Sequence, residues 1–318
     1  MPSFRAGDSK PLGVDALRVR SAFTLLEVLI SATILGILVV LISQTIGRVG
    51  EVWRQGQAQV EKSEGGRAIL YFMAKELQAV ILPVNREDQA SLQLLVNPAV
   101  LSDFENHDAI FWQAPLASDQ TLGNIAEMGY FVKWDNSDGL HPKALLCRFI
   151  VNPGNNYAAD PNYLITSSPN AWLTPGIVSD VAPADSLHSY KGLFVENVLA
   201  LWVTCLDPAG NAISQPPGGA GSFDSRTGYS YTAVGGSSVT LAGGALPAAI
   251  DISVVLIDSS SAKRITPAIR DEIKSLASDA NVKNANDFVT AALRDNSLKS
   301  IRSGLRPCMT RIYLQNSK

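Results

Sequence analysis

A membrane-length apolar run near the N-terminus constrains this chain more than any other feature. The sequence "AFTLLEVLISATILGILVVLI" occupies residues 22–42, and its only charged residue is Glu27. An α-helix rises about 1.5 Å per residue, so residues 23–42 cover about 30 Å, the thickness of one hydrocarbon core. A carboxylate in hydrocarbon is costly, and ordinary membrane anchors avoid one, so either the run is not a membrane segment or Glu27 has a partner there.

The residues before this run carry a surplus of positive charge. Arg18 and Arg20 stand just ahead of it, and basic residues outnumber acidic ones in segment 1–22, although the whole chain has a formal net charge of −3. By the positive-inside rule, this asymmetry favours a cytoplasmic N-terminus with the rest of the chain across the membrane. A secretory signal peptide is disfavoured, because its apolar stretch has about 7 to 15 residues and ends in a small-residue cleavage site.

The stretch "AFTLLEVLIS" resembles the prepilin processing motif of type IV pilins and type II secretion pseudopilins. The resemblance implies that a prepilin peptidase cuts between Ala22 and Phe23 and methylates Phe23 as the new N-terminus. Residues 1–22 are then a cleaved leader, and Glu27 is the fifth residue of the mature chain. Ala22 departs from the family pattern, in which glycine is commonest at this position, but its side chain is still small.

Cleavage also implies a partner for Glu27. It frees an α-amino group at Phe23, which is a cation at neutral pH. In a bundle of parallel helices, Glu27 of one subunit can lie beside the Phe23 amine of its neighbour, so that neither charge stays alone in low dielectric. We therefore expect Glu27 to act in assembly, as a device that sets the register of polymerisation.

The helix is expected to continue beyond the membrane. Apolar residues recur at i, i+3/i+4 spacing from Val49 to Ile81, and Pro83 cannot continue the hydrogen-bond ladder. The pattern predicts one long helix over residues 23–82, with a membrane-spanning part at 23–42 and an amphipathic part that packs on a head domain.

Residues 83–318 are predicted to form that head domain. Short apolar or alternating runs separated by turn-rich stretches are typical of antiparallel sheet. Segments 152–190 and 207–247 are rich in turn-forming residues and are expected to be loops, the second of them either mobile or an elaborated hairpin. The predicted strands cover residues 92–96, 109–113, 129–134, 144–151, 193–206, 249–258 and 308–315.

A helical insert is predicted over residues 265–304. Thr266 is a good N-cap, and Pro267 suits the first helical position. The insert is either a lid over one sheet face or a contact surface for a neighbouring subunit. The predicted class is thus α+β and pilin-like, with one long N-terminal helix packed on an antiparallel β-sheet head.

The order of pieces in the head carries a finer resemblance. The stretch "NVLALWV", then "CLDPAGN", a variable insert, "LPAAIDISVVLID" and a last strand resemble J-type minor pseudopilins. They are also similar to the pseudopilin-like proteins of the Verrucomicrobia (Verru_Chthon) cassette families, especially the C type.

Signals of catalysis are missing from the sequence. It contains no P-loop, no H-E-x-x-H, no C-x-x-C and no G-x-S-x-G. His107, His141 and His188 sit on separate segments without a paired acid. We therefore expect no enzymatic activity, no cofactor and no metal site.

Two features of the head leave alternatives open. Residues 152–162 offer oxygen donors of the kind that G-type pseudopilins use for calcium, but they lack the alternating aspartates of a strong site. Cys147 and Cys205 fall in predicted strands, and a periplasmic location would permit a disulfide between them. The third cysteine, Cys308, weakens that pairing and favours free thiols.

The leading functional interpretation is structural: a pseudopilin or pilin-like subunit of a type II secretion or type IV pilus-type filament. The alternative is a minor pilin whose head is a tip adhesin or ligand-binding module. The implied partners are a prepilin peptidase, other pilin-like subunits, and an inner-membrane assembly platform with its ATPase. The expected location is the bacterial inner membrane, with a single pass and the head in the periplasm.

Overall fold

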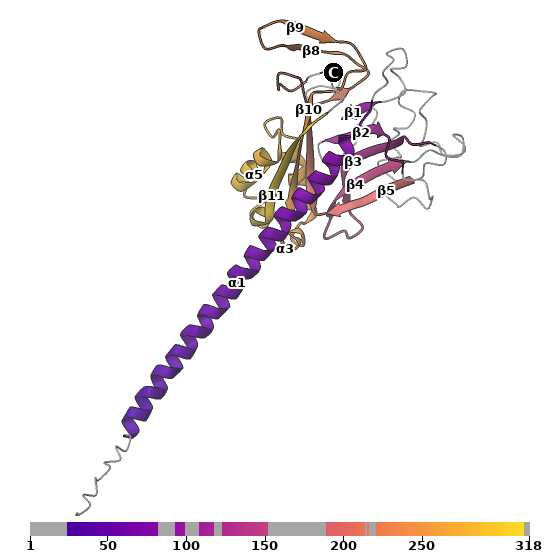
Figure 1. The fold of residues 1–318 in the computed structure, drawn as a ribbon. Coiled ribbons are helices and arrows are strands. Elements are labelled where there is room, and N and C mark those ends of the chain that lie inside the picture. The colour runs from indigo at the N-terminus through magenta and orange to yellow at the C-terminus, as the bar shows by residue number, and fades with distance from the viewer. Residues whose placement is uncertain are drawn as a thin grey trace, which may run out of the picture. The chain divides into compact units, whose positions relative to one another are not determined.

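The computed structural model describes residues 24–81, 93–98, 108–117, 123–151, 189–213, 215 and 221–314, with the backbone alone for 47–63 and 189–192. The chain divides into two compact units, Met1–Gln57 and Ala58–Lys318, and each is described here by itself. An N-terminal helix, antiparallel sheets and a few shorter helices make up the described part (Figure 1). The predicted α+β, pilin-like fold class is therefore confirmed.

The long helix α1 covers Leu25–Leu77, 53 residues. We expected it to reach Leu82, but it ends five residues earlier, because the chain turns toward a strand. The N–H of Val80 donates to the Leu77 carbonyl (3.1 Å), which closes the last turn, and the N–H of Ile81 donates to the Gln113 carbonyl (3.5 Å).

In the described part of the chain, the β structure consists of two antiparallel sheets and one separate two-stranded ribbon. The larger sheet, sheet A, has the strand order β5-β4-β3-β2-β1-β7. The smaller sheet, sheet B, has the order β11-β10-β6, and β8 pairs with β9 alone. The strands are β1 (Leu94–Val96), β2 (Ala109–Ala114), β3 (Ala126–Asp135), β4 (Lys143–Val151), β5 (Ser189–Glu196), β6 (Val198–Leu206), β7 (Phe223–Asp224), β8 (Tyr229–Thr232), β9 (Ser238–Leu241), β10 (Ala249–Ile257) and β11 (Leu305–Tyr313).

The run 193–206, predicted as one strand, is divided between the two sheets. Asn197 separates β5 from β6 with φ 65°, a left-handed conformation that asparagine tolerates better than most residues. Its N–H donates to the Ala144 carbonyl (2.8 Å), and its carbonyl accepts from the N–H of Ile257 (3.0 Å). This corner transfers the chain from sheet A to sheet B.

Sheet B lies between two hydrophobic cores. One core joins the head half of α1 to one face of each sheet. The other core joins the opposite face of sheet B to the helical insert. Ile273 and Phe288 of the insert are buried there, and the Phe288 ring lies 5.7 Å from the Trp202 ring. The insert therefore covers one sheet face, as the lid alternative expected.

The insert begins where the sequence predicted. The Thr266 hydroxyl accepts from the N–H of Ile269 (3.4 Å), and Pro267 is the first helical residue. Two short helices that were not predicted flank the main pair. The helices are α3 (Ser259–Ala262), α4 (Pro267–Ala277), α5 (Ala285–Arg294) and the 3₁₀ helix η2 (Arg302–Gly304).

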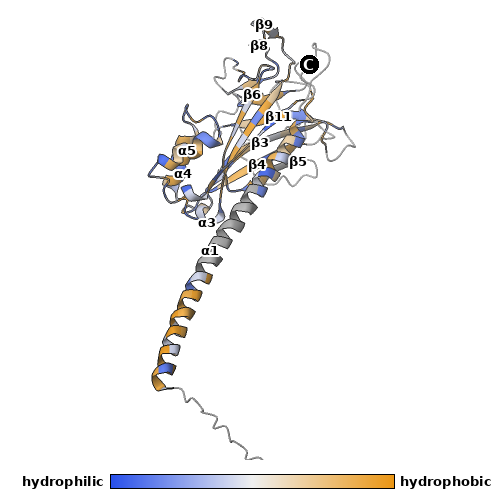
Figure 2. Cartoon of the chain, turned by 60° about the vertical axis from the view of Figure 1, so that its left-hand side comes forward, coloured by the Kyte–Doolittle hydropathy of each residue, from blue (hydrophilic) through white to orange (hydrophobic). Residues whose placement is uncertain are grey.

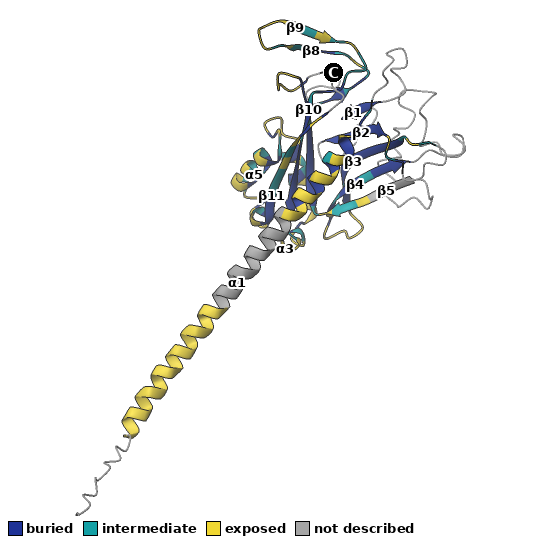
Figure 3. Cartoon of the chain, in the orientation of Figure 1, coloured by how far each residue is buried: buried dark blue, intermediate teal, exposed yellow. Residues whose placement is uncertain are grey.

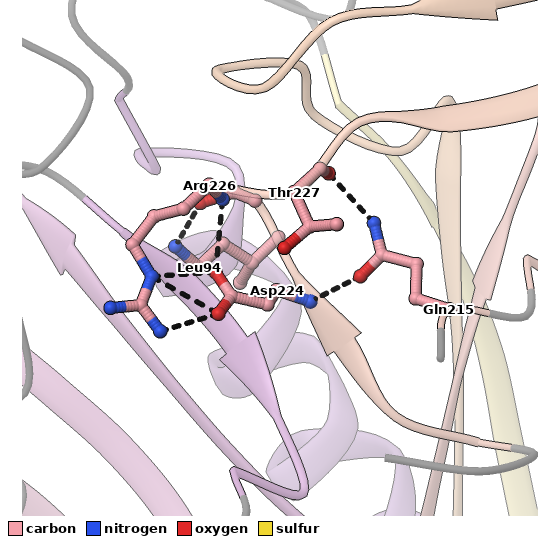
Figure 4. Close-up of polar contacts among 6 residues, drawn as sticks. Leu94, Gln215, Asp224, Arg226 and Thr227 are labelled. Carbon is pink, nitrogen blue, oxygen red and sulfur yellow. Dashed lines mark hydrogen bonds and ion pairs between the residues drawn. The ribbon is translucent and has the colours of Figure 1, made fainter. Parts of the chain in front are cut away.

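Segment 207–247, predicted as a loop, contains β7 and the β8–β9 hairpin, so the elaborated-hairpin alternative describes it better. Hydrogen bonds from side chains to backbone groups hold this segment in place (Figure 4). The Gln215 amide donates to the Thr227 carbonyl (2.8 Å) and accepts from the N–H of Asp224 (2.7 Å). The Ser225 hydroxyl accepts from the N–H of Leu94 (3.0 Å), which ties the segment to β1.

The head half of α1 packs as its apolar stripe predicted. Leu70, Met73 and Leu77 are buried in the core shared with the sheets, together with Ile69. The side chain of Val60, which also belongs to the predicted apolar pattern, lies outside the described set. Figure 3 shows exposed residues alternating with this buried stripe along the helix.

A buried carboxylate also fixes α1 to sheet A. Glu76 accepts hydrogen bonds from the Tyr130 hydroxyl and from the Arg148 guanidinium, whose Nε lies 3.2 Å from Glu76 Oε2. Burial first, and then the charge of Glu76, raise the pKa of Tyr130, so the phenol remains a donor. Arg148 also lies over the Phe72 ring, 5.7 Å from its centroid. The carboxylate thus has two donors in a site that excludes most water.

Candidate functional site

The first part of α1 is the candidate assembly segment. Among the described residues, one helical stretch is long and apolar enough to cross a membrane, Leu25–Ile46, and none of its most apolar window is buried. Figure 2 shows this stretch as a largely hydrophobic helix. Apolar surface of this extent is unstable in water, so it requires lipid or other apolar helices around it.

Hydroxyl groups inside this segment are satisfied by its own backbone. The Ser31 hydroxyl donates to the Glu27 carbonyl (2.8 Å), and that of Thr45 donates to the Leu41 carbonyl (2.8 Å). Thr33 donates to the Leu29 carbonyl (2.6 Å) in the same way. Backbone-bonded hydroxyls cost little in hydrocarbon, so these residues are compatible with a membrane-spanning helix.

Thr24 and Glu27 define the start of the helix. The N–H of Glu27 donates to the Thr24 hydroxyl (3.2 Å) and to the Thr24 carbonyl (3.0 Å). The spacing T-x-x-E is that of a capping box, and an acidic residue in the first turn is favoured by the helix dipole. The sequence contains this signal at Thr24, but the prediction for the segment rested on Ala22, Phe23 and Glu27 and did not include Thr24.

The Glu27 side chain is exposed, and no ion pair to it is present among the described residues. A carboxylate is costly in apolar surroundings, and the partner expected for Glu27 remains a prediction. The two predicted processing residues, Ala22 and Phe23, lie outside the described residues, so their roles remain predictions, as does the assembly role of Glu27.

Of the other candidate residues, the structure describes His141. His141 is exposed in the turn between β3 and β4, whereas His107, His188 and the loop 152–162 lie outside the described residues. No group of three or more metal-ligating side chains is present in the part of the chain that the structure describes.

All three cysteines are free thiols, so Cys147 and Cys205 do not form the disulfide that had been left open. Burial raises the pKa of the Cys147 thiol to about 12 and also raises that of Cys205. Neutral, buried thiols of this kind act as small apolar residues and not as nucleophiles.

Comparison with known families identifies the N-terminal segment. Residues 17–43 match the prokaryotic N-terminal methylation motif. The segment is a prepilin-type methylation motif. Together with the apolar helix that starts within it, the match supports membership of the type IV pilin and pseudopilin family. No curated protein and no solved structure matched the chain.

The prepilin-type motif overlaps the start of the helix. The match ends at residue 43, inside the apolar stretch, and begins in the basic segment before it. A motif recognised by a prepilin peptidase thus coincides with Thr24, Glu27 and the first turns of α1. The head, by contrast, carries no match that assigns it a role.

Proposed function

We propose that the chain is a pilin-like subunit of a type II secretion or type IV pilus-type filament, with a structural role in secretion or filament assembly. One observation carries the proposal: the methylation motif at residues 17–43 overlaps an apolar helix of membrane length that keeps one carboxylate, Glu27. A plain anchor has no use for that carboxylate, whereas a polymerising helix has one.

In this proposal, the prepilin peptidase cuts between Ala22 and Phe23 and methylates Phe23. Before cleavage the subunit spans the bacterial inner membrane once, with its N-terminus in the cytoplasm and its head in the periplasm. Assembly then requires other pilin-like subunits and an inner-membrane platform driven by an ATPase. The order of β6, β10 and β11, with an insert on each side of β10, favours a minor, J-type-like subunit.

The pairing of Glu27 with the Phe23 amine of a neighbouring subunit follows from the physical chemistry of the segment. Glu27 sits in the first turn of α1, within four residues of the proposed new N-terminus. Two parallel helices offset along their axes can place these charges together, and each charge then compensates the other in low dielectric.

The mature N-terminus tests this proposal. Full-length protein is extracted from membranes of its native host, and the mass of its N-terminal peptide is measured. We expect a peptide that begins with N-methylated Phe23. Ala22→Gly should be processed at least as fast, because the residue before the cut must be small, whereas Ala22→Leu should retain the leader. A wild-type chain that still begins at Met1 would identify a plain anchor instead.

A further inference from the structure

The β8–β9 hairpin is a separate ribbon that belongs to neither sheet. Its register runs from Tyr229 opposite Leu241 to Thr232 opposite Ser238. Figure 1 shows the ribbon extending from one end of the head, with β9 on its outer side. Two-stranded ribbons are marginally stable in water, and a third strand would stabilise this one.

The outer edge of β9 presents free backbone groups. The N–H of Ala233 donates to the Ser237 carbonyl (2.8 Å), so Ala233 and Ser237 form a hydrogen-bonded pair next to the turn. Along an antiparallel ladder, hydrogen-bonded pairs alternate with non-hydrogen-bonded pairs. The pairs that contain Ser238 and Thr240 are therefore non-hydrogen-bonded, and the N–H and carbonyl groups of these two residues point away from β8. No hydrogen bond from these groups to another described segment is present.

The β9 edge also lacks the features that keep edge strands apart. Residues 228–246 contain no charged residue and no proline. The edge strand β11 of sheet B, by contrast, carries Arg306, Pro307 and Arg311. Charges and prolines on edge strands prevent pairing with other chains, so their absence leaves the β9 edge open to a further strand.

The base of the ribbon is held firmly to the head. The Tyr229 hydroxyl donates to the Leu246 carbonyl (3.1 Å), and its ring lies edge-on to Phe223 at 6.1 Å. The N–H of Gly244 donates to the Ser225 carbonyl (2.7 Å). An edge held in the strand conformation loses little entropy on binding, so it is prepared for a partner.

We propose that the β9 edge binds an extended, uncharged segment of a partner polypeptide as a third strand. Backbone hydrogen bonds to Ser238 and Thr240 supply the affinity, as in other cases of strand addition. The partner segment is uncharged, because the ribbon has no countercharge for an ionised side chain that pairing would desolvate. The tip residue Val234, 99% exposed, offers an apolar contact beside the same edge.

Binding of a synthetic strand to the full chain in detergent micelles tests the proposal. The probe is a fluorescein-labelled peptide, Lys-Thr-Val-Thr-Val-Thr-Val-Lys, and the measurement is fluorescence anisotropy. Its six central residues are uncharged and form the pairing stretch, and its terminal lysines lie outside that stretch and keep the peptide soluble. We expect saturable binding that Thr240→Pro weakens about tenfold, because proline removes an outward donor. The matched control is Ser230→Pro. Ser230 faces Thr240 across the ribbon, 2.8 Å between hydroxyl oxygens, but its N–H lies on the β8 edge.

A peptide methylated on alternate backbone nitrogens tests the same bonds without altering the protein, and we expect it not to bind. The proposal is overturned if the parent peptide shows no saturable binding, if the methylated peptide binds equally, or if both proline variants lose affinity alike. Sedimentation of the chain without peptide tests whether the edge binds a second copy of the chain instead. Self-association that Thr240→Pro abolishes would assign the edge to a second copy and would overturn the proposal.

Discussion

Gly65 and Gly66 are neighbours in α1, but a methyl group added at each would meet different surroundings. A Cβ at Gly66 would lie 2.4 Å from Cys308 Sγ and 2.7 Å from Leu256 Cδ1, whereas nothing lies within 4 Å of one at Gly65. At the scale of single residues, Gly66 therefore allows the helix to approach sheet B closely. Gly65 has no such role, and its effect is to make the helix less stable than alanine would.

This difference predicts opposite effects of the same substitution. Gly65→Ala should raise the free energy of unfolding by about 1 kcal/mol through helix propensity. Gly66→Ala should lower it by about 1 kcal/mol, because overpacking outweighs that gain. Urea unfolding followed by tryptophan fluorescence measures both. Adding Cys308→Ala to Gly66→Ala should recover part of the loss, and equal stabilisation by the two alanines would contradict the close packing.

At the scale of elements, the attachment of α1 depends on one buried carboxylate as well as on apolar contacts. Glu76 and Arg148 have side chains that are 11% and 19% exposed, so removing Glu76 leaves a mostly buried cation without its partner. The Tyr130 hydroxyl loses its acceptor at the same time. Removing one partner of a buried ion pair is costly, because the remaining charge, here that of Arg148, stays desolvated without compensation.

Glu76→Ala should therefore lower the free energy of unfolding by about 3 kcal/mol. Lys75→Ala is the matched control, since Lys75 is the preceding helical residue and is exposed, and it should change stability by less than about 0.5 kcal/mol. Urea denaturation of the full chain in detergent gives both values. A similar, small effect of the two variants would show that Glu76 does not hold the helix in place.

The head half of α1 should also be needed for the head to fold. Residues 84–318 expressed alone lack Met73 and Leu77, both fully buried, and so expose the core that these residues cover. We expect insoluble or poorly folded material. Residues 58–318, which form one compact unit, should give a soluble fragment with cooperative unfolding. Cooperative, native-like unfolding of 84–318 would refute the dependence on the helix.

Strong local signals made much of the fold predictable. Thr266 and Pro267 placed the start of α4, and the apolar run 144–151 lies within β4, Lys143–Val151. The corner at Asn197 was missed, because a single asparagine inside a continuous apolar run gives no turn signal. The order in 207–247 was expected only as one of two alternatives, because its Gly- and Ser-rich composition does not reveal that side chains such as Gln215 bond to its backbone.

The candidate site was predictable only in part. The spacing of Phe23 and Glu27 pointed to a prepilin-type segment, which the family match supports. Glu76 could not be recognised, since its partners Tyr130 and Arg148 lie 54 and 72 residues away in sequence. A lone glutamate on an amphipathic helix is ordinarily a solvent-facing residue, and only the tertiary structure reveals its burial.

At the scale of the whole molecule, the chain consists of an apolar segment that requires apolar surroundings and a head that packs on the rest of α1. No described residue forms an ion pair with Glu27 of the apolar segment, and in the proposed filament the Phe23 amine of a neighbouring subunit is its partner. Glu27→Leu should leave membrane insertion intact, because it removes a charge that costs about 2.5 to 3.5 kcal/mol in an apolar helix. Cleavage after Ala22 should also continue.

Crosslinking of membrane-extracted subunits to their pilin-like neighbours tests this central claim most directly. Wild-type chains should give crosslinked adducts, Glu27→Asp should give fewer, and Glu27→Leu should give few or none. The reason is that the neighbouring Phe23 amine loses its partner in low dielectric, at a cost of about 3 to 5 kcal/mol. Mature, inserted Glu27→Leu protein that crosslinks as well as wild type would contradict the paired-charge account of assembly.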